Sequence, residues 1–162
     1  MLGVRIQIMR TMLLSFKADV YKRVLSGEKI YEHRKVFPNE PILAYLYVSS
    51  PAQVITGKMV LGNKRKIEDF LDIYHNDLEV CKRVHRYMKE HNYVMEIQDF
   101  QQTTEIPLST LRKDLDRFII PQMYYFLDDT PLLKYIENNI KNEGVHIIND
   151  FMNVDKKFVC NG

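Results

Sequence analysis

The chain has 162 residues, of which 46% are hydrophobic and 27% are charged, and its formal net charge at pH 7 is +2. This length suits one domain with a hydrophobic core and is short for two. No apolar run approaches the ~20 residues of a membrane-spanning helix. The two cysteines, Cys81 and Cys160, are too few for a disulfide framework and lack zinc-site spacing, so we expect a cytoplasmic protein without a metal or cofactor.

The amino-terminal segment carries no recognisable targeting signal. Its first 14 residues contain Arg5 and Arg10, only short apolar runs and no clear small-residue cleavage site, so a secretory leader is not expected. Met9 and Met12 are alternative positions at which translation of the natural chain could begin.

Residues 18–26 are predicted to form a helix that ends at a glycine. Val20, Val24 and Leu25 recur at helical spacing, and Gly27 follows where a left-handed residue ends many helices. A short strand is expected directly after it.

The segment after Gly27 carries an ammonium, a carboxylate and a guanidinium within six residues, on Lys29, Glu32 and Arg34. On a strand, Glu32 and Arg34 share one side, about 6 to 7 Å apart, where they can pair or hold a ligand. An exposed edge strand with alternating charge, kept for solubility, explains the same pattern. Lys29 faces the other way if the strand has already begun, and reaches the same side if it lies in the turn. The sequence leaves these alternatives open.

Residues 42–48 are apolar and aromatic throughout, which predicts a strand buried on both faces. Tyr45 and Tyr47 share one face of it. Such a pair serves as a stacking platform for unpaired bases or packs under a helix with its hydroxyls at the rim. Ser49 and Ser50 then precede Pro51 in a turn, where they meet a polar ligand or bond their own backbone.

The rest of the chain reads as helices, then strands, then helix and strand again. Residues 67–91 are predicted to form a helical insertion with two apolar stripes, the first through Phe70, Leu71 and Tyr74 and the second through Leu78, Cys81, His85 and Met88. Its acidic, polar outer face favours a structural or partner-binding role. A strand follows at 93–103, and the aromatic residues 118–127 predict a strand that closes a barrel. A last helix begins after Thr130 and reaches residue 142, and residues 145–151 add an edge strand.

Charge is divided unevenly along the chain. Residues 1–66 contain 12 Lys or Arg against 4 Asp or Glu, a net charge of +8, whereas residues 67–162 contain 11 against 17, a net of −6. If the fold gathers the basic residues into a groove, they form the footprint expected for nucleic-acid phosphates. Otherwise they are scattered over a solvated surface. For residues 64–66, a solvated surface explains the sequence at least as well as a phosphate-binding groove does.

The charged segment also resembles a known family. Gly27, Lys29, Glu32 and Arg34 match the GxKxxExR signature of the ASCH domains, relatives of the PUA-like barrels. Residues 14–17, 47–51 and 54–58 look like that family's strands, and Pro121 with Gln122 is similar to a proline-containing stretch near the end of many members. The resemblance covers roughly residues 12–127. It implies a small β-barrel with a cleft beside the signature that binds RNA or a nucleobase-like ligand.

We therefore predict an α+β fold, a single domain over residues 1–162 built as a small PUA-like β-barrel with flanking helices. Its barrel core spans roughly 12–127, its helical insertion 67–91, and its carboxy-terminal helix and edge strand 130–154. The predicted ligand-binding residues are Lys29, Tyr31, Glu32, Arg34, Tyr47, Ser49 and Ser50. The predicted phosphate contacts are Lys22, Arg23, Lys35 and Lys58.

Two other functions stay open. Some proteins of the resembled family look like nucleoside amidohydrolases or ribonucleases, and an enzyme of this kind would use Lys29 and Glu32. The amidohydrolase-like members carry a threonine where this chain has Glu32, so the hydroxyl nucleophile is missing here. An adaptor that binds a protein partner through the acidic helical half is the third possibility.

Overall fold

The structure, a computed structural model, describes residues 9–162. The predictions about a leader and about the choice of start therefore fall largely outside the described residues. The strands are β1 (Arg10–Phe16), β2 (Tyr31–Arg34), β3 (Ile42–Val48), β4 (Val54–Lys66), β5 (Tyr93–Thr103), β6 (Ile106–Pro107), β7 (Tyr124–Phe126) and β8 (Asn142–Ile148). The helices are α1 (Ala18–Leu25), α2 (Asp69–Ile73), α3 (Leu78–Met88), α4 (Leu108–Asp114) and α5 (Pro131–Asn139), with a short 3₁₀ turn at Lys156–Phe158.

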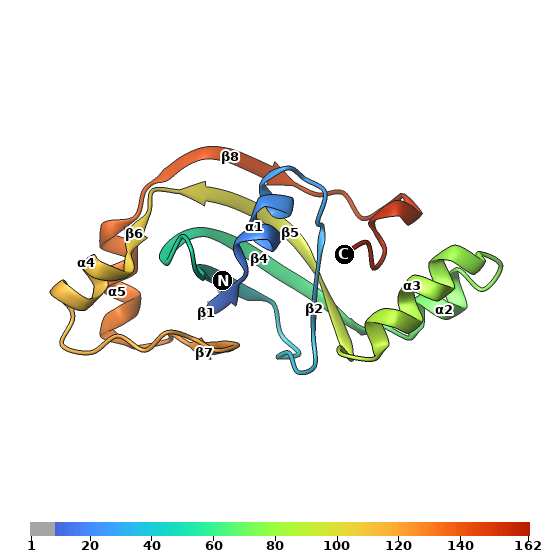
Figure 1. Cartoon of the computed structure of the whole chain (residues 1–162), viewed down its shortest axis with the longest axis horizontal. Helices are drawn as coiled ribbons and strands as arrows, with labels where there is room; N and C mark the ends of the chain where they lie inside the picture. The colour runs from blue at the N-terminus through green and yellow to red at the C-terminus, as the bar shows by residue number, and fades with distance from the viewer. Residues whose placement is uncertain (1–8) are drawn as a thin grey trace, which may run out of the picture.

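All eight strands join one mixed, strongly curled sheet (Figure 1). Its main path runs β2-β5-β4-β3-β1-β7, with β6 added to β4 and β8 added to β5. Strands β1 and β3 are parallel, and α1 and β2 lie in the connection between them, while the other ladders are antiparallel. The fold is thus α+β, as predicted. Within residues 9–162 no ladder joins β2 to β7, so the sheet is a half-barrel, and a closed barrel is not shown.

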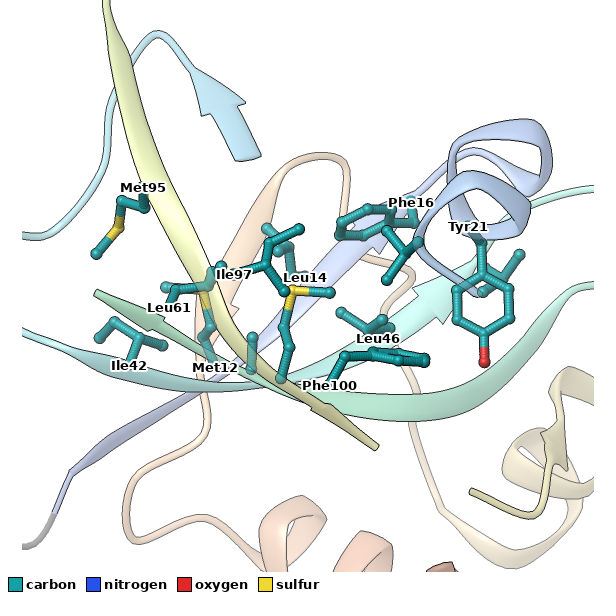
Figure 2. Close-up of a cluster of buried hydrophobic side chains, with 14 of the residues drawn as sticks. Met12, Leu14, Phe16, Tyr21, Ile42, Leu46, Leu61, Met95, Ile97 and Phe100 are labelled. Carbon is teal, nitrogen blue, oxygen red and sulfur yellow. The ribbon is translucent and has the colours of Figure 1, made fainter. Parts of the chain in front are cut away.

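The concave side of the sheet holds the largest hydrophobic core. Alternate residues of β1 and β3, including Met12, Leu14, Ile42 and Leu46, point into it and meet Phe100 of β5 (Figure 2). Helix α1 covers this core with Tyr21 and Val24. The intervening residues of the same strands face the convex side, where Leu13, Tyr45 and Tyr47 pack under α4 and α5. This alternation explains why residues 42–48 are apolar on both faces.

Helices α2 and α3 lie between β4 and β5 and build a separate core with β2 and the carboxy-terminal segment. The helical pattern and the stripe through Phe70 were predicted correctly, but the second predicted stripe was wrong at Leu78 and His85. Val80 and Val84 are the buried residues of α3, whereas Leu78 is 69% exposed and His85 is exposed. The two valines sit one turn apart and face Val94 and Ile67, so they take the buried positions.

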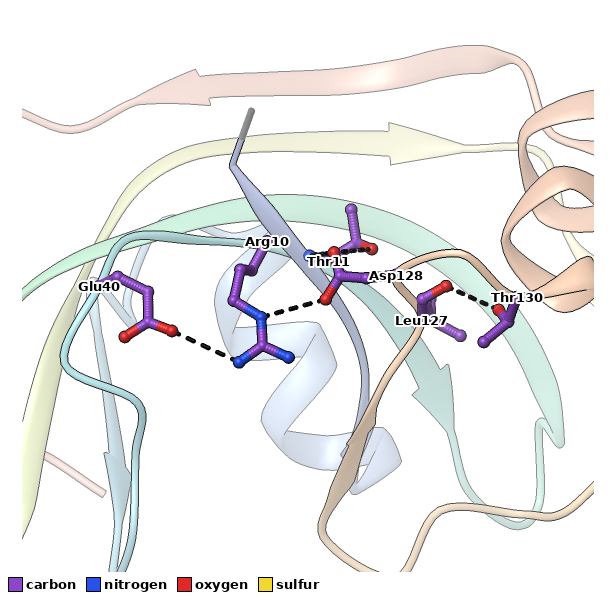
Figure 3. Close-up of polar contacts among 6 residues, drawn as sticks. All are labelled: Arg10, Thr11, Glu40, Leu127, Asp128 and Thr130. Atoms are coloured by element: carbon purple, nitrogen blue, oxygen red, sulfur yellow. Dashed lines mark hydrogen bonds and ion pairs between the residues drawn. The ribbon is translucent and has the colours of Figure 1, made fainter. Parts of the chain in front are cut away.

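The aromatic segment 118–127 yields a shorter strand than predicted. Only Tyr124–Phe126 form β7, which pairs with Met12, Leu13 and Leu14 of β1. Just beyond it, the Asp128 carboxylate accepts hydrogen bonds from the Thr11 backbone amide at 3.0 Å and from Arg10 Nε at 3.1 Å (Figure 3). Arg10 also reaches Glu40 at 3.5 Å. These contacts fix the end of β7 against β1 and against the loop before β3.

Candidate functional site

Gly27 sets the position of the charged segment. Its φ angle of +81° is the left-handed conformation that a glycine adopts most easily, and it ends α1 as predicted. Because β2 begins only at Tyr31, Lys29 lies in the turn before the strand and not on it. The turn conformation brings the Lys29 ammonium to 3.7 Å from Glu32 Oε2. The alternative in which Lys29 faces away from Glu32 is therefore wrong.

Glu32 and Arg34 share one side of β2 and form an ion pair. Arg34 Nε donates to Glu32 Oε1 at 2.9 Å, and Arg34 Nη2 donates to the Ser15 carbonyl at 2.8 Å. The side chains of Lys29, Glu32 and Arg34 are 10%, 6% and 17% exposed. The segment is therefore not the exposed, solubilising edge that was one of the sequence alternatives.

Two features of this cluster indicate unmet bonding capacity. Glu32 Oε2 is buried and accepts no hydrogen bond from residues 9–162. Burial lowers the pKa of the Lys29 ammonium, the Glu32 carboxylate opposes that shift, and Arg23 and Arg34 add to it. A buried acceptor beside a poorly solvated donor is costly unless a further partner is bound, because both groups have lost water.

The cluster forms one wall of a cleft of about 820 Å³. Its lining residues come from six parts of the chain: the end of β1 with α1, the segment around β2, Ser49 after β3, the end of α3, Gln122 before β7, and the last residue, Gly162. The charged side chains are the bases Lys17, Arg23, Lys29, Arg34, Arg86 and Lys89 and the acids Asp19, Glu32 and Glu90. The excess of cations gives the cleft a positive field that attracts anionic ligands.

Two residues of the predicted site, in addition to the cluster, lie in this cleft. Ser49 lines it where β3 ends, and Arg23 lines it from α1. Arg23 Nη2 donates to the Asn161 carbonyl and side-chain oxygens at 2.9 and 3.0 Å, and so ties the carboxy-terminal segment to α1. Arg23 and Asn161, which are 138 positions apart in the sequence, are thus in direct contact.

The two predicted tyrosines do not reach the cleft, which corrects the sequence-based site. Tyr47 is 1% exposed and packs on the convex face against Phe118, so of the two sequence alternatives the packing one is right. Tyr31 is buried among Phe70 and Phe151 on the side of β2 opposite to Glu32.

Four further residues predicted to contact the ligand or its phosphates do not line the cleft. Ser50 lies in the exposed turn before the cis proline Pro51, and Lys22 is exposed on α1. Lys35 follows β2 at the surface, and Lys58 lies in mid-strand on β4. Their positions follow from strand and helix alternation, which the charge count along the chain does not reveal.

The run at residues 64–66 is partly structural. Lys64 Nζ donates to the Phe37 carbonyl at 2.6 Å, and Arg65 pairs with the buried Glu96 at 3.2 Å. Lys66 is exposed and pairs weakly with Glu68 at 3.7 Å. For Lys64 and Arg65, the alternative of basic residues scattered over a solvated surface is therefore wrong.

Sequence reasoning missed the contribution of α3 to the cleft. Arg86 and Lys89 line it, three positions apart and so on one helical face, and His91 follows. The predicted acidic, polar outer face of the helical insertion does not account for these basic side chains at the end of α3. The spacing of Arg86 and Lys89 is the signal that could have found them.

His33 also contributes to the cleft, from the opposite side of β2 to Glu32. Its ring packs edge-on against Tyr87 at 4.6 Å between centroids, and its Nδ1 atom has no hydrogen-bond partner among the described residues. Burial lowers the pKa of His33 well below 6.5, and the nearby Lys29, His91 and Arg23 lower it further. His33 is therefore an uncharged imidazole at neutral pH.

The described part of the chain offers no group of three or more His, Cys, Asp or Glu side chains that could hold a metal ion. Over the same residues, none of the helices has the length and apolar character needed to cross a membrane.

Comparison with known proteins supports the fold. No protein-family model and no curated protein sequence matches the chain. The crystal structure of the ASCH protein from Zymomonas mobilis matches with a TM-score of 0.62 and 18% sequence identity, over 82% of this chain and 96% of that one. A serine-to-alanine mutant of the same protein matches with a TM-score of 0.58 and 18% identity, over 79% of this chain and 95% of that one. The chain therefore has an ASCH-like fold, as the sequence resemblance implied.

Proposed function

We propose that the cleft binds single-stranded RNA through one nucleobase held beside Lys29, Glu32 and Arg34. The observation that carries this proposal is the buried Glu32 Oε2 atom, which accepts no hydrogen bond from residues 9–162 and lies 3.7 Å from the Lys29 ammonium. An acceptor next to a donor complements the edge of a nucleobase, which presents an N–H donor beside a carbonyl or ring-nitrogen acceptor.

Each residue of the cluster has a distinct role in this proposal. Glu32 accepts a hydrogen bond from a ring N–H or an exocyclic amine, and Lys29 donates to the neighbouring acceptor. Arg34 holds Glu32 Oε1 at 2.9 Å and leaves Oε2 for the ligand, so it positions the carboxylate as well as adding charge. The bases Arg23, Arg86 and Lys89 line the same cleft and favour the phosphates of the strand.

The salt dependence of RNA binding tests the proposal. The affinity for a single-stranded RNA should fall linearly with the logarithm of salt concentration, with a slope of about −0.7 per phosphate contacted. Arg34→Ala should weaken binding and flatten the slope, whereas Lys141→Ala, an exposed lysine outside the cleft, should change neither. Equal and small effects of both variants would overturn the proposal. An unfolding curve for each variant is needed, because loss of one partner of a buried ion pair also destabilises the fold.

A hydrolase is the second candidate function. It is favoured by the position of the Lys29 ammonium 3.7 Å from the Glu32 carboxylate, in a buried setting that lowers the pKa of Lys29, since such pairs are used for proton transfer. In such a reaction Glu32 takes a proton from an attacking water, and Lys29 donates to the oxygen that becomes negative. Turnover of RNA or of a modified nucleoside, lost in a folded Glu32→Gln variant, would support this candidate over simple binding.

A further inference from the structure

A second cavity adjoins the cleft across His91. It has a volume of about 240 Å³ and is lined by Lys66, Glu68, Met88, His91, Asn92 and Tyr93. His91 lines both cavities, so they are neighbours that share one side chain. A free nucleobase in the cleft has no use for this second cavity, whereas a strand that continues past the first base does.

The sheet register connects the two cavities. Tyr93 of β5 lies directly opposite Arg34 of β2 and opposite Lys66 of β4. Residues directly opposite each other in antiparallel strands have side chains on the same face, with Cβ atoms about 5 Å apart. Arg34, Tyr93 and Lys66 therefore form a row across three strands that leads from the cleft into the second cavity.

Tyr93 is suited to stack on a base. Tyr93 is half-buried and lines the second cavity, and the Lys64 ammonium sits 4.0 Å from its ring centroid. Lys64 is held in place by the Phe37 carbonyl and does not line the cavity. Tyr93 thus lines the cavity while a cation–π contact with Lys64 orients its ring. Aromatic rings in such settings bind bases of any sequence.

Lys66 supplies charge at the same place. Its side chain is 63% exposed, and its pair with Glu68 at 3.7 Å is weak because solvent screens it. A phosphate can therefore compete with Glu68 for the ammonium. Asn92 adds a side chain that donates to the Lys35 carbonyl at 3.3 Å and orders this rim of the cavity.

We infer that the second cavity binds the nucleotide adjacent to the one in the cleft, so that the ligand is an oligoribonucleotide and not a free nucleobase. Tyr93 stacks on the second base, and Lys66 contacts the phosphate beside it. This inference rests on the proposed function, because it extends the same binding surface by one nucleotide.

Binding of two kinds of probe tests the inference: the four ribonucleoside 5′-monophosphates and a mixed-sequence hexaribonucleotide. The wild-type protein should bind the hexanucleotide more tightly than any monophosphate. Tyr93→Ala should weaken hexanucleotide binding about fivefold or more, as expected for a lost base–aromatic stack, and should reduce the advantage of the hexanucleotide over the monophosphates. Tyr93→Phe, which keeps the ring, should bind as the wild type does.

Lys66→Ala gives an independent arm of the test, since the side chain is exposed and its loss spares the fold. It should reduce the salt slope for the hexanucleotide by about 0.7, and Lys82→Ala, an exposed lysine on α3 that lines neither cavity, should not. If folded Tyr93→Ala or Lys66→Ala binds the hexanucleotide like the wild type while Arg34→Ala weakens it, the inference is wrong and the proposed function stands. If Arg34→Ala has no effect, both are wrong.

Discussion

Arg34 Nε donates to Glu32 Oε1 at 2.9 Å, across the two-residue repeat of strand β2. The same guanidinium donates to the Ser15 carbonyl of β1, so one side chain links β2 to a strand with which it forms no ladder. Among the described residues, Arg34 therefore bridges the two strands through its side chain, where no backbone ladder joins them. The cleft wall and the stability of the fold therefore depend on the same residue.

The first prediction concerns the stability that Arg34 supplies. Arg34→Ala leaves the buried Glu32 with Lys29 alone and removes the donor to Ser15, so the free energy of unfolding should fall by on the order of 2 kcal/mol. Arg34→Lys keeps the charge but not the fork that reaches both acceptors, and it should recover only part of the loss. Urea denaturation measures both, with Lys141→Ala as the control. A loss below about 0.5 kcal/mol, the usual range for a surface change, would contradict the structural role.

The second prediction concerns His33 and pH. Burial lowers the pKa of His33 in the folded protein well below 6.5, the ordinary value for a histidine in an unfolded chain. At pH values between the folded-state pKa and 6.5, the unfolded chain therefore binds a proton that the folded protein does not. The stabilising effect of the neutral form is complete above pH 6.5 and is lost as pH falls below it. The free energy of unfolding should then decrease by up to about 1.4 kcal/mol per pH unit because of this residue.

The comparison that isolates this effect uses His33→Gln, which cannot take up the proton. The difference in unfolding free energy between wild type and His33→Gln should shrink as pH falls from 7 to 5. His85→Gln, at an exposed position of α3, serves as the matched control. A difference that stays constant over this range would show that His33 does not resist protonation.

The third prediction concerns the contacts at the end of β7 (Figure 3). Burial raises the pKa of the Asp128 carboxyl, but hydrogen bonds from the Thr11 amide, Arg10 and the Thr11 hydroxyl outweigh it and bring the pKa below 3.8. The stabilisation is therefore present above pH 3.8 and is lost as pH falls through the folded-state value. Asp128→Ala should cost about 1 kcal/mol at pH 7, since the side chain is one-third exposed, and less at pH 3.

Thermal unfolding at the two pH values measures this effect, with Asp116→Ala at an exposed site as the control. An equal loss for Asp128→Ala at pH 7 and at pH 3 would mean that the carboxylate charge is not involved.

The fourth prediction concerns catalysis. The amidohydrolase-like proteins that the signature resembles carry a threonine where this chain has Glu32, and a carboxylate cannot take over as nucleophile without forming a mixed anhydride. We expect no appreciable deacetylation of N4-acetylcytidine by the wild-type protein. Lys29→Ala should likewise show no deacetylation. Product analysis of the purified protein incubated with N4-acetylcytidine or with single-stranded RNA, with and without divalent metal, checks this. Turnover that disappears in folded Lys29→Ala or Glu32→Gln would support an enzyme, with Ser49 of the cleft as the candidate hydroxyl.

Local features of this protein could be predicted from its amino-acid sequence. Helical spacing before Gly27 predicted α1 and its left-handed end, and the alternation at 93–103 predicted β5. The signature of Gly27, Lys29, Glu32 and Arg34 was recognised from four positions within eight residues of sequence. These features depend on backbone preferences and on neighbours two to four positions away, so they can be read from a linear sequence.

Contacts between side chains from distant segments could not be predicted in this way. Tyr47 was buried under α4 and α5 because strand alternation turns it to the convex face, whereas Arg86 and Lys89 reached the cleft because α3 packs beside β2. Tyr93 came to lie beside Arg34 through the register of β5 against β2, over 59 positions of sequence. Such contacts follow from packing and register between distant segments, which local spacing and charge counts do not contain.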